Sequence, residues 1–547
     1  MFSIWFLVNL IQATYTEVLS DEAYYWLYGK YLAWGYFDHP PMVALLVKIS
    51  SLFFKGNLGI RFMTVLLEIF TLLFIWRIID DQKPDREKVS SFFIIASSIC
   101  LFQAYGFFTT PDVPLLFFTA FFLFSYKDYL KDQSWKSVLF LSLSMAGLIY
   151  SKYQAALVIG FVVISNTKLL KSYKFWVAGI FALILIAPHM WWQIVNDYPS
   201  FKFHLVERSE GFRWHHLLEY LPNQMAVFNP LVLGAVVYIM AKNKPDDLFT
   251  RALHFLIIGF IGFFGLTAFR GHVEPHWTIA CSVAMIILLY NNSSVNPKMF
   301  LFIRRWLLPS ILLLFAARIL LVSNLTFIRT LGFNGKEAKF EFIESVAKDR
   351  PVVFPGSFQK PSLYSFFTGR EGIAINILSS RKTEFDIWQF EKEYNNKPAF
   401  VCGLAKGRSR LYEKDGIRFY AYTTDSLQTI NRIGVEIKPR LKIIHIGDSL
   451  SLSIILNNPY PYDINFKHRE FPVKICMAFL KDDEVYIFPL ILKEPIVIMQ
   501  SGETLTRTLK TRVPILPSGK YSFGVCLQTI IGPAINDSFR IIEIVKR

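Results

Sequence analysis

Residues 20–42 read S-D-E-A-Y-Y-W-L-Y-G-K-Y-L-A-W-G-Y-F-D-H-P-P-M. Two adjacent carboxylates, Asp21 and Glu22, follow an apolar N-terminal segment, and a run of aromatic rings then leads to Asp38, His39 and two prolines. Carboxylates at the end of a membrane helix are costly unless they face water or a substrate cavity. Aromatic rings suit the membrane interface, because the ring body stays in lipid while a polar edge meets water. We interpret this stretch as the rim of an active site at a membrane surface.

The composition is that of a membrane protein. Of 547 residues, 53% are hydrophobic and 18% are charged, which is too apolar for a soluble chain of this size. The formal net charge of +16 would also suit a nucleic-acid-binding protein. We exclude that class because the basic residues fall between apolar segments, as they do in cytoplasmic loops. The five cysteines show no C-x-x-C or metal-ligand spacing, so they define neither a disulfide framework nor a redox compartment.

Apolar segments recur along the first 325 residues, and about twenty such residues cross the hydrocarbon core. The segment at 2–19 is predicted to be an anchor, since neither a basic start nor a small-residue cleavage site marks it as a signal peptide. Residues 41–54 are too short to cross, and they predict an interfacial helix. About eleven spans are predicted, at residues 2–19, 58–79, 89–108, 113–130, 136–150, 153–167, 175–195, 226–241, 252–270, 275–291 and 306–325.

Every second loop between these spans is basic, as in the pairs Lys171 with Lys174 and Arg304 with Arg305. The positive-inside rule then places the N-terminus in the cytoplasm and everything after residue 325 outside. One long kinked helix over residues 136–167 would invert the rest of this topology. On the predicted topology the polar, ring-rich junctions share one membrane face; they are residues 21–42, 109–114, 151–153, 196–225 and 270–277.

These junctions resemble glycosyltransferase family 39, which groups the protein O-mannosyltransferases with bacterial transferases that put aminoarabinose on lipid A. The matching runs are A-Y-Y-W and G-Y-F-D-H-P-P-M after the acidic pair, T-P-D-V-P-L-L-F-F, G-L-I-Y-S-K-Y-Q-A-A-L and G-H-V-E-P-H-W-T. The resemblance covers roughly residues 1–400. It implies a membrane-embedded α-helical fold of the GT-C type and a sugar donor carried on a polyprenyl phosphate.

The resemblance also implies roles for the carboxylates. Asp21 matches the family's catalytic acidic residue and is expected to take the proton of the acceptor, which a carboxylate within hydrogen-bond reach can do. Glu22 is expected to orient Asp21 or to bind sugar hydroxyls. Asp112, between two prolines, is a second candidate that would serve the acceptor or a divalent ion. For Asp21 and Asp112 the alternative is a helix cap.

A departing phosphate needs cations, and Lys152 and Arg270 lie in family-like motifs at predicted outer helix ends. The alternative for both is snorkelling to lipid headgroups. Weaker candidates for phosphate binding are Arg61, Arg208 and Arg213.

Further side chains in these motifs are expected to bind substrate: Tyr24, Tyr25, Asp38, His39, Tyr153, Glu274 and His276. The sequence requires no cofactor. Asp38 and His39, together with His272, Glu274 or His276, leave a divalent metal ion open, since such residues bind metals in proteins. No fixed ligand spacing supports that metal.

The long apolar runs end near residue 325, so the membrane domain is predicted to be residues 1–325. Residues 326–404 mix a helical pattern at 336–348 with a strand at 352–354 and predict a small extracytoplasmic α/β segment. Residues 405–547 show short alternating strands separated by turn signals, which favours an extracytoplasmic β-sandwich-like domain.

The sequence thus predicts an integral glycosyltransferase of a bacterial inner membrane. It would move a sugar from a polyprenyl-phosphate donor to an envelope acceptor (a lipid A-like lipid, a glycan or a protein) on the extracytoplasmic face. Inversion in a single displacement is implied by the resemblance. The alternative is a transporter or flippase of lipid-linked sugars, which needs charged or helix-breaking residues within several spans. Lys48 and Glu68 lie in or near apolar stretches, but no internal repeat is visible. A non-catalytic scaffold with a vestigial site is a third interpretation.

Overall fold

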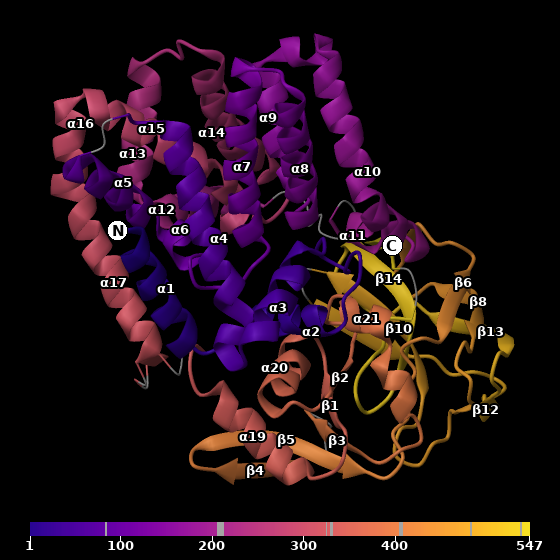
Figure 1. Cartoon of the computed structure of the whole chain (residues 1–547). Helices are drawn as coiled ribbons and strands as arrows, with labels where there is room; N and C mark the ends of the chain where they lie inside the picture. The colour runs from indigo at the N-terminus through magenta and orange to yellow at the C-terminus, as the bar shows by residue number, and fades with distance from the viewer. Residues whose placement is uncertain are drawn as a thin grey trace. The chain divides into compact units, whose positions relative to one another are not determined.

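The computed structural model describes residues 1–546 except 83–84, 205–212, 324, 326, 329–331, 404–407, 482–483 and 537–538. The chain divides into two compact units, Met1–Lys336 and Glu337–Arg547. The first unit is helical, whereas the second combines helices with β-sheets (Figure 1).

The first unit is built from helices because a helix satisfies its backbone hydrogen bonds within one segment, as a lipid environment demands. Its helices are α1 (Phe2–Tyr15), α2 (Ser20–Lys30), α3 (Met42–Phe53), α4 (Gly56–Ile79), α5 (Arg86–Ser98), α6 (Cys100–Ala104), α7 (Asp112–Lys131), α8 (Trp135–Ser151), α9 (Ala155–Ser165), α10 (Tyr173–Val195), α11 (Pro199–Lys202), α12 (Trp214–Phe228), α13 (Pro230–Lys242), α14 (Leu248–Thr267), α15 (Ser282–Val295), α16 (Pro297–Phe302) and α17 (Leu308–Val322). Short turns of other helix types are η1 (Thr167–Lys171), η3 (Pro275–Cys281) and η4 (Ile303–Leu307).

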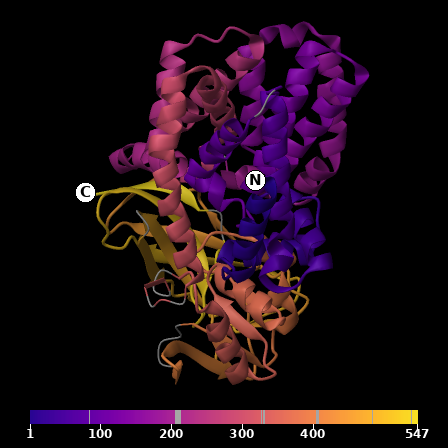
Figure 2. The same cartoon turned by 60° about the vertical axis from the view of Figure 1, so that its left-hand side comes forward.

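Six helical segments are long and apolar enough to cross a membrane, so the chain is a multi-pass membrane protein. They are α4, α7, α10, α14, η3 with α15, and α16 through α17. The last of these is one continuous helix in Figure 2. The pair α12 and α13, bent by 96°, adds a seventh candidate, and α1, α3, α8 and α9 are shorter apolar helices. Helix is present in every predicted span, while the total of eleven crossings stays a prediction.

Two predicted spans contain breaks that hydropathy does not register. The segment at 89–108 divides into α5 and α6 at Ile99, whose backbone is extended. The segment at 226–241 begins within α12 and bends at Asn229, which has φ of 74°. Pro230 causes this bend, because a proline disfavours the helical conformation in the residue before it. Asparagine tolerates a positive φ better than most residues do.

The helices α8 and α9 are separate, as the predicted topology requires. Lys152, which follows α8, has φ of −163° and ψ of 144°, so the helix ends there. Because α9 begins only at Ala155, one continuous helix over residues 136–167 is excluded.

Arg318 and Glu68 are among the ionisable side chains that are buried between the helices of the first unit. The Arg318 guanidinium lies 4.6 Å from the centre of the Phe107 ring and donates to Asn9 Oδ1 at 2.8 Å, which ties α17 to α1. Glu68 of α4 is 1% exposed, and its Oε1 has no hydrogen-bond partner in the described part of the chain. Buried ionisable residues within membrane helices are costly and often functional.

The second unit contains a five-stranded sheet with the strand order β2-β1-β3-β5-β4. The helices and strands of this part of the chain are α19 (Lys336–Ala347), β1 (Val352–Pro355), α20 (Gln359–Thr368), β2 (Gly372–Ile375), α21 (Glu384–Trp388), η5 (Phe390–Tyr394), β3 (Ala399–Cys402), β4 (Arg410–Lys414) and β5 (Ile417–Thr424). Strand β1 pairs in parallel with β2 and β3, whereas β5 is antiparallel to β3 and β4. Strand pairing thus carries the α/β segment through Thr424 rather than ending it at residue 404.

The remaining strands form a five-stranded, a three-stranded and a two-stranded sheet, and the two larger sheets enclose one apolar core. They are β6 (Gly434–Lys438), β7 (Ile443–His445), β8 (Ser449–Asn457), β9 (Ile464–Asn465), β10 (Lys474–Lys481), β11 (Glu484–Pro489), β12 (Ile498–Met499), β13 (Thr504–Arg512), β14 (Gly519–Gln528) and β15 (Arg540–Val545). The sheet β11-β10-β14-β15-β7 buries Met477 and Val525, and the sheet β13-β8-β6 buries Leu452 and Leu509 in the same core. This arrangement is that of a sandwich. The three-domain division as a whole stays a prediction.

Candidate functional site

The acidic pair lies in the first turn of α2, where the helix dipole favours negative charge. The Glu22 carboxylate accepts the backbone N–H of Leu19 at 3.0 Å and so closes the capping box of this helix. Asp21, in contrast, is exposed. Because Glu22 caps the helix, Asp21 does not act as its cap.

Glu22 is fully buried, and it joins three segments of the chain. Its Oε1 accepts a hydrogen bond from Arg61 Nε of α4 at 2.7 Å, and its Oε2 accepts one from Nη2 of the same guanidinium. Oε1 also accepts the backbone N–H of Thr109 at 2.9 Å. The buried Arg61 guanidinium therefore donates its hydrogen bonds to Glu22 and to nearby backbone carbonyls rather than to a phosphate.

A second buried ion pair forms where α7 begins and α8 ends. Lys152 Nζ lies 2.7 Å from Asp112 Oδ1, and both side chains are almost completely buried. Asp112 Oδ2 accepts the Tyr105 hydroxyl at 3.4 Å and lies 3.9 Å from His276 Nε2. Asp112 does not cap α7, because the N-cap residue is Pro111.

The two ion pairs belong to one region. Thr109, whose N–H bonds to Glu22, lies three residues before Asp112. The Tyr105 hydroxyl, which donates to Asp112, belongs to the residue four positions before Thr109. The fold therefore places the Asp112–Lys152 pair close to the segment that Glu22 ties to α2, and Asp21 is the exposed neighbour of Glu22 on that helix.

The aromatic residues that follow α2 fold back on that helix. The rings of Tyr28 and Tyr36 are stacked with centres 3.8 Å apart, and the Tyr28 hydroxyl donates to Asp38 Oδ1 at 2.6 Å. Asp38 is 4% exposed. The Tyr25 hydroxyl lies 3.4 Å from His39 Nε2. These bonds shape residues 31–41 into a loop with a defined conformation.

The C-terminal part of α10 supports the same loop. His189 Nδ1 lies 2.7 Å from the carbonyl oxygen of Trp34, so this nitrogen donates and Nε2 is left to accept the Tyr153 hydroxyl at 3.2 Å. Gln193 donates to that hydroxyl at 2.9 Å and to Ser200 at 2.8 Å. The residue next to Lys152 is thereby fastened to the loop that carries Asp38 and His39.

Comparison with known proteins matches this region. Residues 38–192, which include Asp38, Asp112 and Lys152, match the family model of dolichyl-phosphate-mannose-protein mannosyltransferases. The lipid A galacturonosyltransferase RgtD of Rhizobium johnstonii is 24% identical over 302 residues, which are 52% of this chain and 63% of that relative. Over this region the chain is similar to glycosyltransferase family 39. The resemblance that the motifs predicted is thereby confirmed.

Solved structures show what fold the chain has. Two structures of ArnT from Cupriavidus metallidurans, in the apo state and bound to undecaprenyl phosphate, superpose with TM-scores of 0.54 and 0.56. They are 13% and 14% identical in sequence, and each match covers 77% of this chain and 96% of ArnT. The first unit therefore has the predicted GT-C membrane fold.

The other candidate site residues lie in different settings. Arg270, after α14, is exposed, and its guanidinium forms no hydrogen bond or ion pair with the described residues. Glu274 Oε2 lies 3.8 Å from His272 Nε2, and Tyr24 is buried against Tyr28. Arg208 lies outside the described residues.

The metal hypothesis was tested against the same side chains. Among the described residues, no group of three or more His, Cys, Asp or Glu side chains is arranged to hold a metal ion. Asp38 is instead bonded to Tyr28, and His276 lies near Asp112. We therefore derive no step that depends on a metal.

Sequence reasoning missed three residues that the fold places in this region: Tyr105, His189 and Gln193. Tyr105 lies seven residues before Asp112, so a ring ahead of the T-P-D motif was the available signal. His189 and Gln193 have helical spacing near the end of a predicted span, a pattern that places both side chains on one face.

Replacing Arg61 with methionine is expected to be strongly destabilising, because Glu22 would remain as an unpaired buried charge. Breaking a buried pair in this way costs about 3–5 kcal/mol. The double variant with Arg61→Met and Glu22→Gln is expected to recover part of that loss, since no charge is then buried. Thermal unfolding in detergent checks both variants. Equal melting temperatures for the single and double variants would contradict the pairing.

Replacing Gly35 with alanine is expected to displace the loop at residues 31–41. An added Cβ would lie 2.5 Å from Trp192 Cε3 and 2.9 Å from His189 Nδ1. Overpacking of this kind costs about 1–3 kcal/mol. If this loop shapes the site, the transfer rate should fall about tenfold or more, because small misplacements are costly in catalysis. Gly262→Ala is the matched control, since a Cβ there meets open space. Full activity in Gly35→Ala would remove the loop from the site.

Proposed function

We propose that this chain is an integral membrane glycosyltransferase that moves a sugar from a polyprenyl-phosphate donor to an acceptor of the cell envelope. The observation that carries the proposal is the buried Asp112–Lys152 pair, which lies close to the segment that Glu22 joins to the helix of the exposed Asp21. A carboxylate open to an acceptor, with a cation close by for a departing phosphate, is what this reaction needs.

Asp21 is the proposed base. It is the exposed member of the acidic pair, while Glu22 is held by Arg61 and Thr109 and so fixes the helix that presents Asp21. The Asp21 carboxylate takes the proton of an acceptor hydroxyl or phosphate oxygen. That oxygen forms a bond to the anomeric carbon of the sugar, and the bond from this carbon to the phosphate oxygen breaks.

The leaving polyprenyl phosphate carries away the bonding electron pair, and its charge needs stabilisation. We assign this role to Lys152, whose ammonium has three donors and gives one to Asp112. Asp112 offsets part of the cost of burying this ammonium, because its carboxylate lies at ion-pair distance. Arg270 is the proposed second cation. A single displacement of this kind inverts the anomeric centre.

The relatives guide the choice of substrates. RgtD is named as a lipid A galacturonosyltransferase, and one ArnT structure contains undecaprenyl phosphate. For this chain we propose a donor of the same lipid-phosphate class and a lipid A-like acceptor, with a glycan or a protein as the other acceptor classes. The chain matches 63% of the length of RgtD. The substrates of this chain therefore have to be tested separately from those of RgtD.

The proposed location is the bacterial inner membrane, with the N-terminus in the cytoplasm and the second unit on the extracytoplasmic side. Reporter fusions test this orientation. Alkaline phosphatase fused at the C-terminus should be active, whereas the same reporter fused after Lys171, in the basic segment between α9 and α10, should be inactive. The opposite pattern would place the acidic pair on the cytoplasmic face.

The function is tested with the purified protein in lipid nanodiscs and a set of labelled polyprenyl-phosphate sugars. With an envelope extract as acceptor, we expect release of free polyprenyl phosphate and transfer of label into one fraction of the extract. A variant with asparagine at both Asp21 and Asp112 serves as the blank. Release that does not depend on the extract would indicate hydrolysis rather than transfer.

The second candidate function is a transporter or flippase of lipid-linked sugars, and one observation favours it. Glu68 and Arg318 are charged residues buried within membrane helices, where such residues often mark a transport path. Proteoliposomes with labelled donor in one leaflet distinguish the two functions. Movement of labelled lipid across the bilayer without any release of polyprenyl phosphate would replace the transferase with the flippase.

A further inference from the structure

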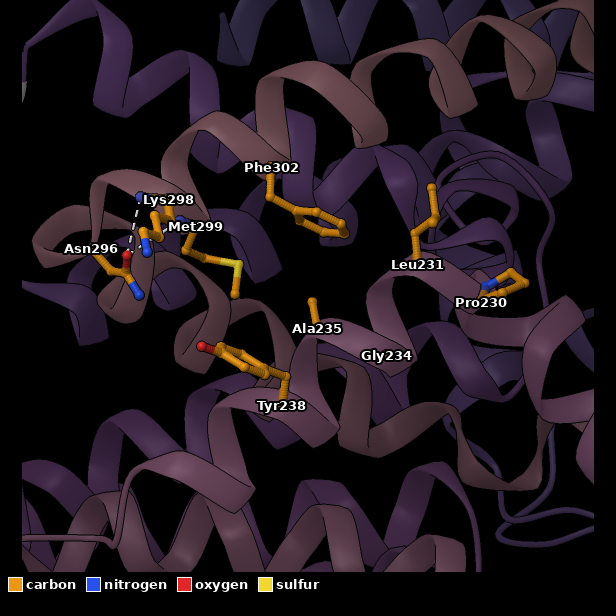
Figure 3. Close-up of a pocket in the computed structure, with 9 residues that line it drawn as sticks. All are labelled: Pro230, Leu231, Gly234, Ala235, Tyr238, Asn296, Lys298, Met299 and Phe302. Atoms are coloured by element: carbon orange, nitrogen blue, oxygen red, sulfur yellow. Dashed lines mark hydrogen bonds between the residues drawn. The ribbon is translucent and has the colours of Figure 1, made fainter.

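A separate cavity lies between α13 and α16 in the first unit (Figure 3). Its volume is about 370 Å³, and much of its lining is apolar, with Leu231, Ala235, Met299 and Phe302 among the residues. Gly234 also lines it, and a Cβ added there would meet nothing within 4 Å. The glycine thus leaves an open slot along one side of α13.

One end of this cavity is polar. Tyr238, Asn296 and Lys298 gather there, while Pro230 and Leu231 lie at the other end (Figure 3). Asn296 Oδ1 accepts the backbone N–H groups of Lys298 and Met299 at 3.1 and 3.4 Å, which leaves its amide N–H groups to donate. The Lys298 ammonium and the Tyr238 hydroxyl have no hydrogen-bond or ion-pair partner in the described part of the chain. Three donor groups with no acceptor opposite them suit an anion.

The polar end lies far from the Asp112–Lys152 pair. The span Pro275–Val295 carries His276, which lies 3.9 Å from Asp112, at its start, and Asn296 follows its end. A helix of this length is roughly 30 Å long. The cavity and the candidate active site therefore lie toward opposite ends of one membrane span.

We propose that this cavity binds one anionic glycerophospholipid of the leaflet next to the basic loops. The lipid phosphate contacts Lys298, Tyr238 and Asn296, and one acyl chain enters the slot over Gly234. The volume falls within the range of about 300–1,000 Å³ that is usual for small-molecule sites. Basic pockets between membrane helices suit anionic lipid headgroups.

A glycerophospholipid fits this cavity better than the polyprenyl-phosphate donor does. The donor's phosphate must reach the cations near Asp112, and these lie toward the other end of the span. The phosphate of a lipid in this leaflet, in contrast, lies at the height of the loops that precede α16. A lipid held between α13 and α16 would also brace α13 next to the bend at Asn229. The inference does not depend on the proposed function.

Native mass spectrometry of the full-length, delipidated protein tests this inference. The probes are phosphatidylglycerol and phosphatidylcholine with identical acyl chains. We expect one phosphatidylglycerol to bind at least about fivefold more tightly than phosphatidylcholine, as expected for one Lys contact near the membrane surface. Lys298→Gln should abolish that preference, and Gly234→Leu should prevent binding because the leucine fills the slot. Tyr238→Phe should weaken phosphatidylglycerol binding a fewfold.

Two matched variants serve as controls. Lys168→Gln removes an exposed lysine of another basic loop, and Gly262→Leu adds a side chain in open space on α14. Both should bind phosphatidylglycerol like the unchanged protein. Elution volume and circular dichroism show whether Gly234→Leu folds. If it does not fold, the two variants Lys298→Gln and Tyr238→Phe test the binding site instead.

Three results would overturn the inference. The first is equal affinity of the unchanged protein for the two lipids, and the second is an undiminished preference in Lys298→Gln. The third concerns the donor lipid. If undecaprenyl phosphate displaces phosphatidylglycerol at equal concentration and also depends on Lys298 and Gly234, the cavity is a site for the carrier lipid.

Discussion

Replacing Asp21 with asparagine is expected to lower the rate of sugar transfer by about 10²- to 10⁴-fold, the usual contribution of a general base. The amide keeps the size of the side chain but cannot accept the acceptor's proton. Because Asp21 is exposed, the change should leave folding nearly intact. Loss of its interaction with the helix dipole costs about 0.3–1 kcal/mol. Single-turnover transfer from a labelled polyprenyl-phosphate sugar measures the rate.

The pH profile separates a base from a structural carboxylate. The unchanged protein should lose kcat/KM as the base becomes protonated at low pH, and this acidic limb should be absent from the residual activity of Asp21→Asn. Asp132→Asn, at the exposed end of α7, is the matched control and should transfer normally. Transfer by Asp21→Asn within tenfold of the unchanged protein would assign the base elsewhere, with Asp112 as the next candidate.

Replacing Lys152 with methionine is expected to reduce both stability and transfer. The buried Asp112 carboxylate would lose its partner, which costs about 3–5 kcal/mol of folding free energy. Loss of a charge-assisted bond to the leaving phosphate, worth about 1.5–3 kcal/mol, lowers the rate by roughly 10- to 100-fold more. Thermal unfolding and transfer assays measure the two effects.

A double variant separates these two effects. Lys152→Met combined with Asp112→Asn buries no charge, so its melting temperature should recover toward that of the unchanged protein. Its transfer rate should stay low, and free polyprenyl phosphate should inhibit it less than it inhibits the unchanged protein. A double variant with normal transfer would show that the pair only holds α7 to α8.

The membrane character and most helices of this protein were predictable from the sequence, because hydropathy and length are local properties. The segment at 58–79 became α4 (Gly56–Ile79), and the pattern at 336–348 became α19 (Lys336–Ala347). The motifs also indicated the family correctly. The breaks at Ile99 and Asn229 were missed, since a window of mean hydropathy averages over single residues.

The candidate site was predicted as a set of residues but not as an arrangement. Asp112 and Lys152 were both singled out, yet nothing in the sequence indicated that they pair with each other. Arg61 was a weaker candidate for phosphate binding, and in the fold it pairs with Glu22. Strands β4 and β5 were assigned to the β-rich domain, although they pair with β3.

The sequence by itself determined that this chain enters a membrane, where its helices lie and which polar residues stand at their ends. Each of these properties depends on a short stretch of residues and its affinity for lipid or water. Only the tertiary structure decided that Glu22 faces inward while Asp21 stays exposed, and that Lys152 meets Asp112. The residues in each ion pair are about forty positions apart. Their contact depends on how α2, α4, α7 and α8 pack, which no local pattern encodes.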